Sequence, residues 1–95
     1  MMHIGVCTIE LRLPDNHSLK GKRSVVKSIS TRVSREFNVS IAEVDAQDIW
    51  QRAVLGVSCV SSSADYAHRQ LERVVQWIEI HRPDVLLLAY SIEML

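Results

Sequence analysis

Positively charged side chains gather in one stretch of this 95-residue chain. The interval from Asn16 to Arg35 holds six of the eleven Lys and Arg residues and no Asp or Glu, although the formal net charge of the whole chain is zero. Lys and Arg beside the free N–H groups of a helix start form a site for phosphate or carboxylate. We predict phosphate or RNA binding by His17, Ser18, Lys20, Lys22, Arg23, Lys27 and Arg35.

Cations are unusual at a helix start, because the helix dipole favours anionic side chains there by about 0.3–1 kcal/mol. Gly21 costs about 1 kcal/mol relative to Ala inside a helix, but it lets a ligand or another part of the chain come close. A bound RNA phosphate would explain both the cations and the glycine. Lys and Arg bind phosphates without reading sequence, and the glycine leaves room for the phosphate to approach. The alternative is that the long cationic side chains only cover an exposed face.

A second candidate site is the segment from residue 47 to residue 52. We predict that Asp48, Trp50, Gln51 and Arg52 contact a partner protein or RNA. Trp50 would stack on a base or on a partner, and Arg52 would hold phosphate or pair with Asp48. In the alternative, Trp50 closes the end of the core and Arg52 makes an internal salt bridge, because a small domain with few aromatics needs each one for burial.

The chain shows no pattern typical of a metal site, a cofactor site or a catalytic centre. His3 and Cys7 would lie about 13 Å apart on a strand, too far to share a metal. There is no Walker-type loop and no Cys-x-x-Cys, and adjacent residues such as His17 and Ser18 rarely form a nucleophile and base pair. We therefore expect a non-enzymatic protein without metal or cofactor, with both cysteines reduced and buried.

The hydrophobic pattern predicts the order strand, helix, strand, strand, helix, strand within a single domain covering residues 1–95. The predicted strands span residues 7–13, 39–45, 53–60 and 85–95. The first predicted helix follows Ser18 and ends before Asn38, and the second follows the serine cluster 61–63 and runs to about Ile80. This order is typical of the split βαβ arrangement, in which two helices cover one face of a four-stranded antiparallel sheet. The other face of the sheet is then left to solvent or to a partner.

Several details of the elements follow from the same pattern. Ser18 is the expected N-cap of the first helix, and Ser62 with Asp65 resembles a capping box for the second. Lys22 falls within the apolar arc of the first helix, so either the helix starts later or this side chain turns to solvent. The second strand has two competing apolar sets, which leaves its inward face open. In the last strand we expect inward-facing side chains at Leu86, Leu88, Tyr90, Ile92 and Met94.

No segment is suited to cross a membrane, since the longest apolar run covers only residues 85–90 and a spanning helix needs roughly 20 residues. The first residues lack the basic start and long apolar stretch of a signal peptide. We therefore expect a cytoplasmic protein with no membrane partner.

Three separate strings of the sequence carry a family resemblance. They are Leu13-Pro14 with His17-Ser18-Leu19-Lys20 and Lys22-Arg23, then Phe37 to Val44, then Gln47 to Ala53. In this order and spacing the chain resembles the YlxP-like family of small bacterial proteins, a domain of unknown function. The resemblance implies a ferredoxin-like α+β fold. It also implies genes that often lie between those of translation initiation factor two and ribosome-binding factor A, and it supplies no catalytic residue.

Two hypotheses for function follow. The first is an accessory factor in ribosome maturation or translation that contacts ribosomal RNA or a ribosome-bound protein through the basic helix, assisted by the segment around Trp50. The second is a homodimeric protein-interaction module that assembles through the open sheet face and recognises an acidic protein or a small anion.

Overall fold

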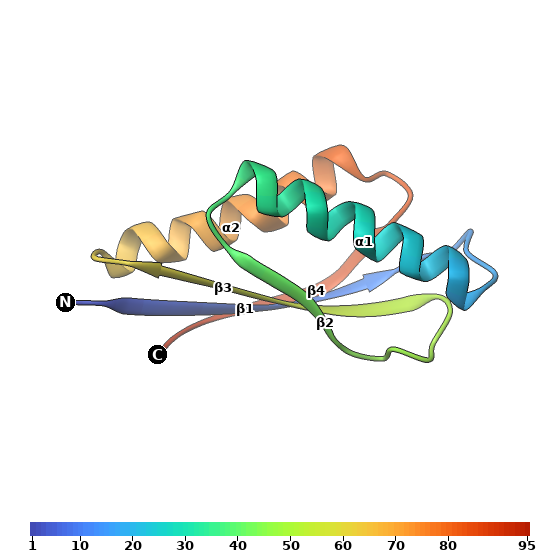
Figure 1. Cartoon of the computed structure of the whole chain (residues 1–95), viewed down its shortest axis with the longest axis horizontal. Helices are drawn as coiled ribbons and strands as arrows, with labels where there is room; N and C mark the ends of the chain where they lie inside the picture. Colours follow the sequence, from blue (N-terminus) through green and yellow to red (C-terminus); the bar gives the residue numbers. More distant parts are fainter.

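The computed structural model describes residues 1–95, and its elements follow the predicted order. They are β1 (His3–Arg12), α1 (Leu19–Glu36), β2 (Ser40–Asp45), β3 (Arg52–Ser61), α2 (Ala64–His81) and β4 (Leu86–Met94). The strands form one antiparallel sheet in the order β2-β3-β1-β4. Both helices lie on one face of this sheet, and no element covers the other face (Figure 1). The predicted ferredoxin-like α+β fold is confirmed.

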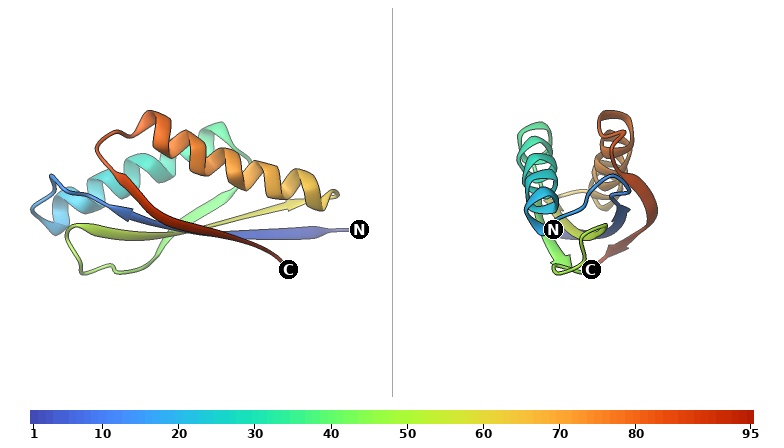
Figure 2. Two further views of the ribbon diagram at one scale, coloured as in Figure 1. Left: turned by 180° about the vertical axis from the view of Figure 1, so that it is seen from behind. Right: turned by 90° about the vertical axis from the view of Figure 1, so that its right-hand side faces the viewer.

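The molecule is elongated, with principal extents of 45 × 22 × 19 Å. The start of α1 and the β2–β3 connection lie at one end, whereas the chain's N-terminus and the start of α2 lie at the other (Figures 1 and 2). The two predicted site segments therefore share one end of the molecule. No helix has the length and apolar character needed to cross a membrane.

The core lies between the helices and the central strands β1 and β3. Alternate residues of β1, among them Cys7, Ile9 and Leu11, point towards the helices and are almost fully buried. Ile29 and Val33 of α1 close the core from above. Each fully buried side chain of this size stabilises the fold by about 1.5–3 kcal/mol, so the period-two pattern of β1 decides which face of the sheet the helices cover.

Serine hydroxyls cap both helices, as predicted, but at one position the residue differs. Ser18 caps α1 by accepting a hydrogen bond from the Gly21 N–H at 2.9 Å. In α2 the cap is Ser63, whose hydroxyl accepts from the Tyr66 N–H at 3.2 Å. The predicted capping box beginning at Ser62 is therefore wrong by one residue, because three consecutive serines offer equivalent hydroxyls and only the backbone path selects one of them.

The predicted inward set of β4 is correct at Ile92 and Met94 and wrong at Leu86, Leu88 and Tyr90, which are about half exposed. A β-bulge in the β1–β4 pairing, between Glu10 and Leu11, is one cause. It moves the alternation by one residue, so Leu87 rather than its neighbours packs against the core. Tyr90 is opposite buried Ile9, but it lies on an edge strand that the helices cover only partly.

Candidate nucleic-acid interface

The two segments predicted as separate sites are joined by hydrogen bonds. The Asn16 side-chain amide donates to the Ser18 carbonyl at 2.8 Å and to the Trp50 carbonyl at 2.6 Å. In return, the Gln51 side chain donates to the Asn16 carbonyl at 3.0 Å. These bonds bring the β1–α1 connection and the β2–β3 connection into one surface. Sequence analysis did not identify this role of Asn16, although an amide before a helix cap was a usable signal.

Lys22 lies beneath this surface and is completely buried. Its ammonium donates to the carbonyls of Ala46 and Ile49 and contacts the Glu43 carboxylate at 2.8 Å. Two of its three N–H donors are used by the carbonyls, and the Glu43 carboxylate balances its charge as an ion pair. The expectation that the helix starts later or that Lys22 turns to solvent is wrong, because α1 begins at Leu19 and the β2–β3 connection supplies acceptors inside the fold.

The buried ammonium fixes the shape of the β2–β3 connection. Ala46 has a positive φ of 59°, a conformation that costs a non-glycine residue of the order of 1–3 kcal/mol. Its carbonyl accepts from Lys22, and its N–H donates to the Asp45 carboxylate at 2.7 Å. Lys22 is therefore a structural anchor of this connection and is not free to contact an anion, although the sequence placed it in the anion-binding set.

The structure explains why residue 21 is a glycine. A Cβ atom at this position would overlap with the Asn16 side-chain oxygen. The sequence suggested that glycine here admits a ligand or another part of the chain, and the group that comes close is the Asn16 side chain. Glycine thus permits the amide that ties the helix start to the Trp50 carbonyl.

The outer side of α1 carries cations without partners. The structure has four ion pairs, and none of them includes a cation from this side. We define the basic face as the exposed residues Lys20, Arg23, Lys27 and Arg35, with His17 at its start. Exposed hydroxyls lie among these cations, at Ser24, Thr31 and Ser34. The only acidic residue in α1 is Glu36, at its last position.

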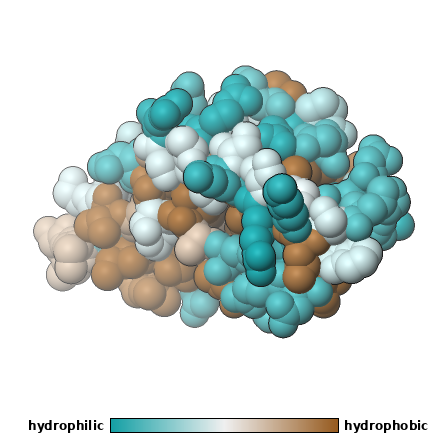
Figure 3. Space-filling model, turned by 45° about the vertical axis from the view of Figure 1, so that its right-hand side comes forward, coloured by the Kyte–Doolittle hydropathy of each residue, from teal (hydrophilic) through white to brown (hydrophobic).

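The basic face extends along most of the helix. Lys20 and Arg35 are fifteen residues apart, which corresponds to about 22 Å along a helix axis. Ten of the eleven acidic residues lie outside α1, so the neutral chain is strongly polarised. In the space-filling view, hydrophilic residues cover most of the part where the helices lie, and hydrophobic residues gather over the receding end of the sheet (Figure 3).

The residues of the β2–β3 connection divide into exposed and structural ones. Trp50 is 53% exposed and Ile49 is 49% exposed, so the interpretation of Trp50 as a cap on the core is wrong. Arg52 pairs with Glu10 at 3.3 Å rather than with Asp48, which leaves the Asp48 carboxylate exposed and unpaired. Gln51 uses its side-chain amide within the fold, so it holds the surface together.

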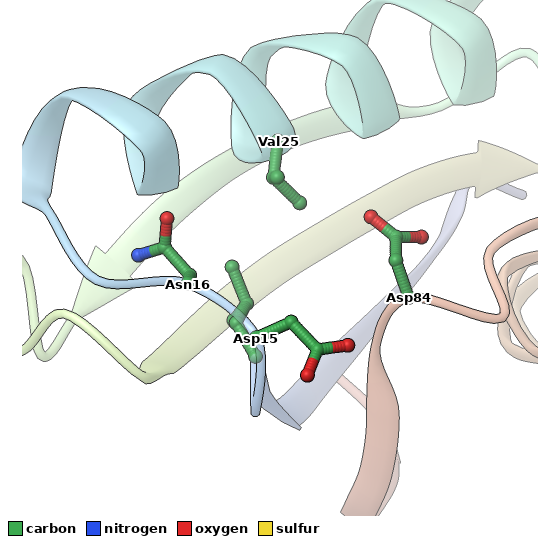
Figure 4. Close-up of a pocket in the computed structure, with 5 residues that line it drawn as sticks. Asp15, Asn16, Val25 and Asp84 are labelled. Carbon is green, nitrogen blue, oxygen red and sulfur yellow. The ribbon is translucent and has the colours of Figure 1, made fainter.

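A small hollow of about 150 Å³ lies beside the site, lined by Leu13, Asp15, Asn16, Val25 and Asp84. Figure 4 shows Val25 pointing into it from α1, with Asp15 and Asp84 on two different connections. The Asp84 carboxylate accepts two hydrogen bonds from Arg82, at 2.7 and 2.9 Å, and the guanidinium lowers the pKa of this carboxyl. Two carboxylates make the hollow unsuited to an anion.

Neither thiol belongs to this surface. Burial raises the pKa of Cys7 to about 11, and burial also raises the pKa of Cys59. Both side chains therefore stay protonated at neutral pH, the state in which a thiol is a poor nucleophile and a poor metal ligand. No group of three or more His, Cys, Asp or Glu side chains is arranged to hold a metal ion.

Comparison with known proteins places the chain in a family. The sequence model of the family described as "Protein of unknown function (DUF503)" matches residues 4–92. The chain belongs to the DUF503 family. A relative in Bacillus subtilis (strain 168), the "Uncharacterized protein YlxP", is 46% identical over 76 residues, which cover 80% of this chain and 83% of that protein. The YlxP-like resemblance is thus confirmed.

A solved structure supports the fold of this DUF503 protein without bearing on its function. The de novo designed protein Foldit4 superposes with a TM-score of 0.55 at 14% sequence identity, covering 98% of this chain and 96% of the designed one. At this identity the likeness concerns the fold alone. The function must therefore be argued from the site.

Proposed function

We propose that this DUF503 protein is a non-enzymatic accessory factor in ribosome maturation or translation that binds ribosomal RNA through the basic face of α1. The observation that carries the proposal is the set of exposed, unpaired cations on α1, which lie among hydroxyl groups on a helix whose only acidic residue is Glu36 at its last position. Lys, Arg, Ser and Thr are the residue types that contact nucleic-acid phosphates. The gene neighbourhood implied by the family resemblance supplies the connection to the ribosome.

The proposal predicts the form of the binding. With about four phosphate contacts, the logarithm of the affinity should fall by about 3 to 4 for each tenfold rise in salt, because each contact releases a condensed counterion. Binding through about four phosphate contacts covers only a short stretch of RNA and depends little on base sequence. A ribosome-bound protein remains an alternative partner, and it would give a shallower salt dependence.

Co-sedimentation with ribosomal subunits from the protein's own cells tests the proposal. The variant Arg23→Glu/Lys27→Glu reverses two cations four residues apart on the basic face, and Arg69→Glu/Arg73→Glu is its matched control on α2. We expect the first variant to lose most of the bound fraction and the control to keep it. Lys22 stays unchanged in both variants because it is buried. Equal binding by both variants, or binding that is insensitive to salt, would refute the proposal.

A second candidate function is a homodimer formed through the open sheet face. Small side chains, among them Ala42, Gly56 and Ser58, line a shallow hollow of about 330 Å³ across β2, β3 and β1. The neighbouring Glu10–Arg52 pair supplies charges of both signs, which suits a two-fold contact because such a contact must be self-complementary. Small residues allow two sheets to approach closely.

Sedimentation equilibrium distinguishes this second candidate from the first. We expect a dimer for the native chain and a monomer for Ser58→Arg, which places a long cation into the hollow. Gln76→Arg on the exposed side of α2 is the control and should remain dimeric. A native chain that stays monomeric at all accessible concentrations would contradict the dimer and leave the RNA proposal intact.

A further inference from the structure

The Trp50 side chain is a large apolar group presented at the surface by a fixed backbone. It is 53% exposed, although burying an aromatic ring is strongly favourable and this chain has few aromatics. The carbonyl of Ile49 accepts from the Lys22 ammonium at 2.9 Å, and the carbonyl of Trp50 accepts from the Asn16 amide at 2.6 Å. Two successive carbonyls are thus anchored, so the backbone that carries the indole is restrained before any ligand arrives.

A restrained backbone matters for binding, because a loop that is already ordered loses little conformational entropy when a ligand binds. The donors that anchor the two carbonyls are the Lys22 ammonium and the Asn16 amide. One of them is a completely buried ammonium, and Ala46 beside it adopts a left-handed conformation. The left-handed conformation of Ala46 destabilises the folded state by the order of 1–3 kcal/mol. The connection that contains this strained residue also carries the exposed Trp50 ring.

The backbone of Trp50 lies beside the start of the basic face. The same Asn16 amide that binds the Trp50 carbonyl also binds the carbonyl of Ser18, the cap of α1. Lys20 follows two residues later. Aromatic rings next to cations are the arrangement with which proteins bind unpaired nucleotides, because the ring stacks on a base while the cations hold the adjacent phosphates.

We infer that Trp50 is a stacking platform for an unpaired RNA base whose neighbouring phosphates lie on the basic face of α1. The inference rests on the proposed function, and it narrows the ligand to structured RNA with an unpaired nucleotide next to a helix. Asp48 lies two residues before Trp50, and its exposed carboxylate would repel an RNA phosphate placed next to it. The same carboxylate accepts hydrogen bonds from base amino groups.

Tryptophan fluorescence tests the inference directly. The chain has two tryptophans, and the second, Trp77, is 8% exposed and packs against His81. In a Trp77→Phe background the emission comes from Trp50 alone. We expect quenching when a ribosomal-RNA hairpin with a single-base bulge is added. A fully paired hairpin of the same length should bind through the basic face without quenching. In both hairpins the loop is replaced by a linker without bases, so that the bulge supplies the only unpaired base.

Affinity measurements with Trp50→Ala complete the test. Stacking of one base corresponds to a loss of about 5- to 150-fold in affinity for the bulged hairpin, with no change for the paired one. Trp50→Phe should retain most of the affinity. Tyr66→Ala removes another exposed aromatic, in the first turn of α2, and should change neither affinity, because α2 starts at the opposite end of the molecule (Figure 1).

The outcomes separate the two proposals. Binding of both hairpins with no quenching and no effect of Trp50→Ala would overturn the inference and keep the proposed function; it is the result expected if Trp50 contacts a protein instead. An equal loss for both hairpins would also overturn it, since stacking on an unpaired base would then not explain the effect. If neither hairpin binds at low salt, the proposed function itself fails.

Discussion

At the scale of single residues, the candidate site depends on Lys22, which is completely buried, and on Asn16, which is partly exposed. Lys22 holds two carbonyls and one carboxylate beneath the β2–β3 connection, and Asn16 joins that connection to the start of α1. A buried ammonium is stable only when all its donors are satisfied. The backbone of Trp50 and the start of α1 keep their positions because these two residues hold them together.

Replacement of Lys22 should therefore reduce stability strongly. Lys22→Met keeps the bulk of the side chain but leaves the Glu43 carboxylate and two carbonyls without their donor. We expect a loss of about 3 kcal/mol in the free energy of unfolding, the lower end for a broken buried ion pair, because the Glu43 side chain keeps 16% exposure. Urea denaturation measures this. Lys22→Met/Glu43→Gln should be less destabilised than Lys22→Met alone, and strictly additive effects would argue against the pairing.

Gly21 offers a prediction with an unusual sign. Gly→Ala inside a helix normally stabilises by about 1 kcal/mol, but here the new methyl group displaces the Asn16 side chain. Two hydrogen bonds worth about 0.5–1.5 kcal/mol each are then lost. We expect Gly21→Ala to destabilise the native chain by about 1 kcal/mol and to stabilise the Asn16→Ala variant. Thermal melts of the four proteins check the reversal, and stabilisation in both backgrounds would exclude the proposed clash.

At the scale of elements, the α2–β4 connection ties the two helices together at their outer side. Arg82 donates to the Ser28 hydroxyl of α1 at 2.8 Å, and it donates two further hydrogen bonds to the Asp84 carboxylate. Arg32 of α1 also lies over the ring of Trp77, 5.0 Å from its centroid. These contacts position the helix that carries the basic face without using the cations of that face.

The Arg82–Asp84 pair should make stability depend on pH in the acid range. The pKa of Asp84 in the folded state is lowered from 3.8, mainly by the hydrogen bonds from Arg82. Its contribution is therefore complete above the unfolded-state pKa and is lost as the pH falls below 3.8 through the lowered value. We expect Asp84→Asn to cost less than about 1 kcal/mol at neutral pH, because Asp84 is 44% exposed.

Urea denaturation of the native chain and Asp84→Asn at several pH values would show this. The difference between the two proteins should disappear at strongly acid pH. Glu79→Gln, which removes an exposed carboxylate of α2 with no ion-pair partner, is the control and should show no such convergence. A difference that persists at the lowest pH would mean that Asp84 acts through packing rather than charge.

At the scale of the whole molecule, the hydrophobic pattern predicted the order of elements, the topology and most of the core. Ile9 and Leu11 in β1 and Leu71 in α2 follow the periods of their elements and are all buried. These features depend on neighbours close in sequence. The inward-facing residues of β4 were mispredicted because a bulge in its pairing with β1 changes the alternation of inward and outward side chains. A bulge of this kind leaves no clear pattern in a single sequence.

The site was predicted in part for a related reason. The exposed cations of α1 could be recognised from composition alone, but the burial of Lys22 could not, because its acceptors Ala46 and Ile49 lie 24 and 27 residues away. The side chain of a lysine in an apolar arc is expected to turn to solvent unless acceptors within the fold are known. Asn16 and Gly21 likewise gain their meaning only when the two connections meet.

The two thiols provide a test of how the whole domain opens. Cys7 and Cys59 lie in the central strands β1 and β3 between sheet and helices, and burial raises the pKa of Cys7 from 9.0 to about 11. We expect neither thiol to react with a disulfide reagent at pH 8 unless the domain unfolds, and both to react with one rate constant that increases with urea. The single variants Cys7→Ala and Cys59→Ala assign the reaction. Rapid labelling of Cys59 alone in native buffer would contradict cooperative opening and indicate that the end of β3 beside α2 separates first.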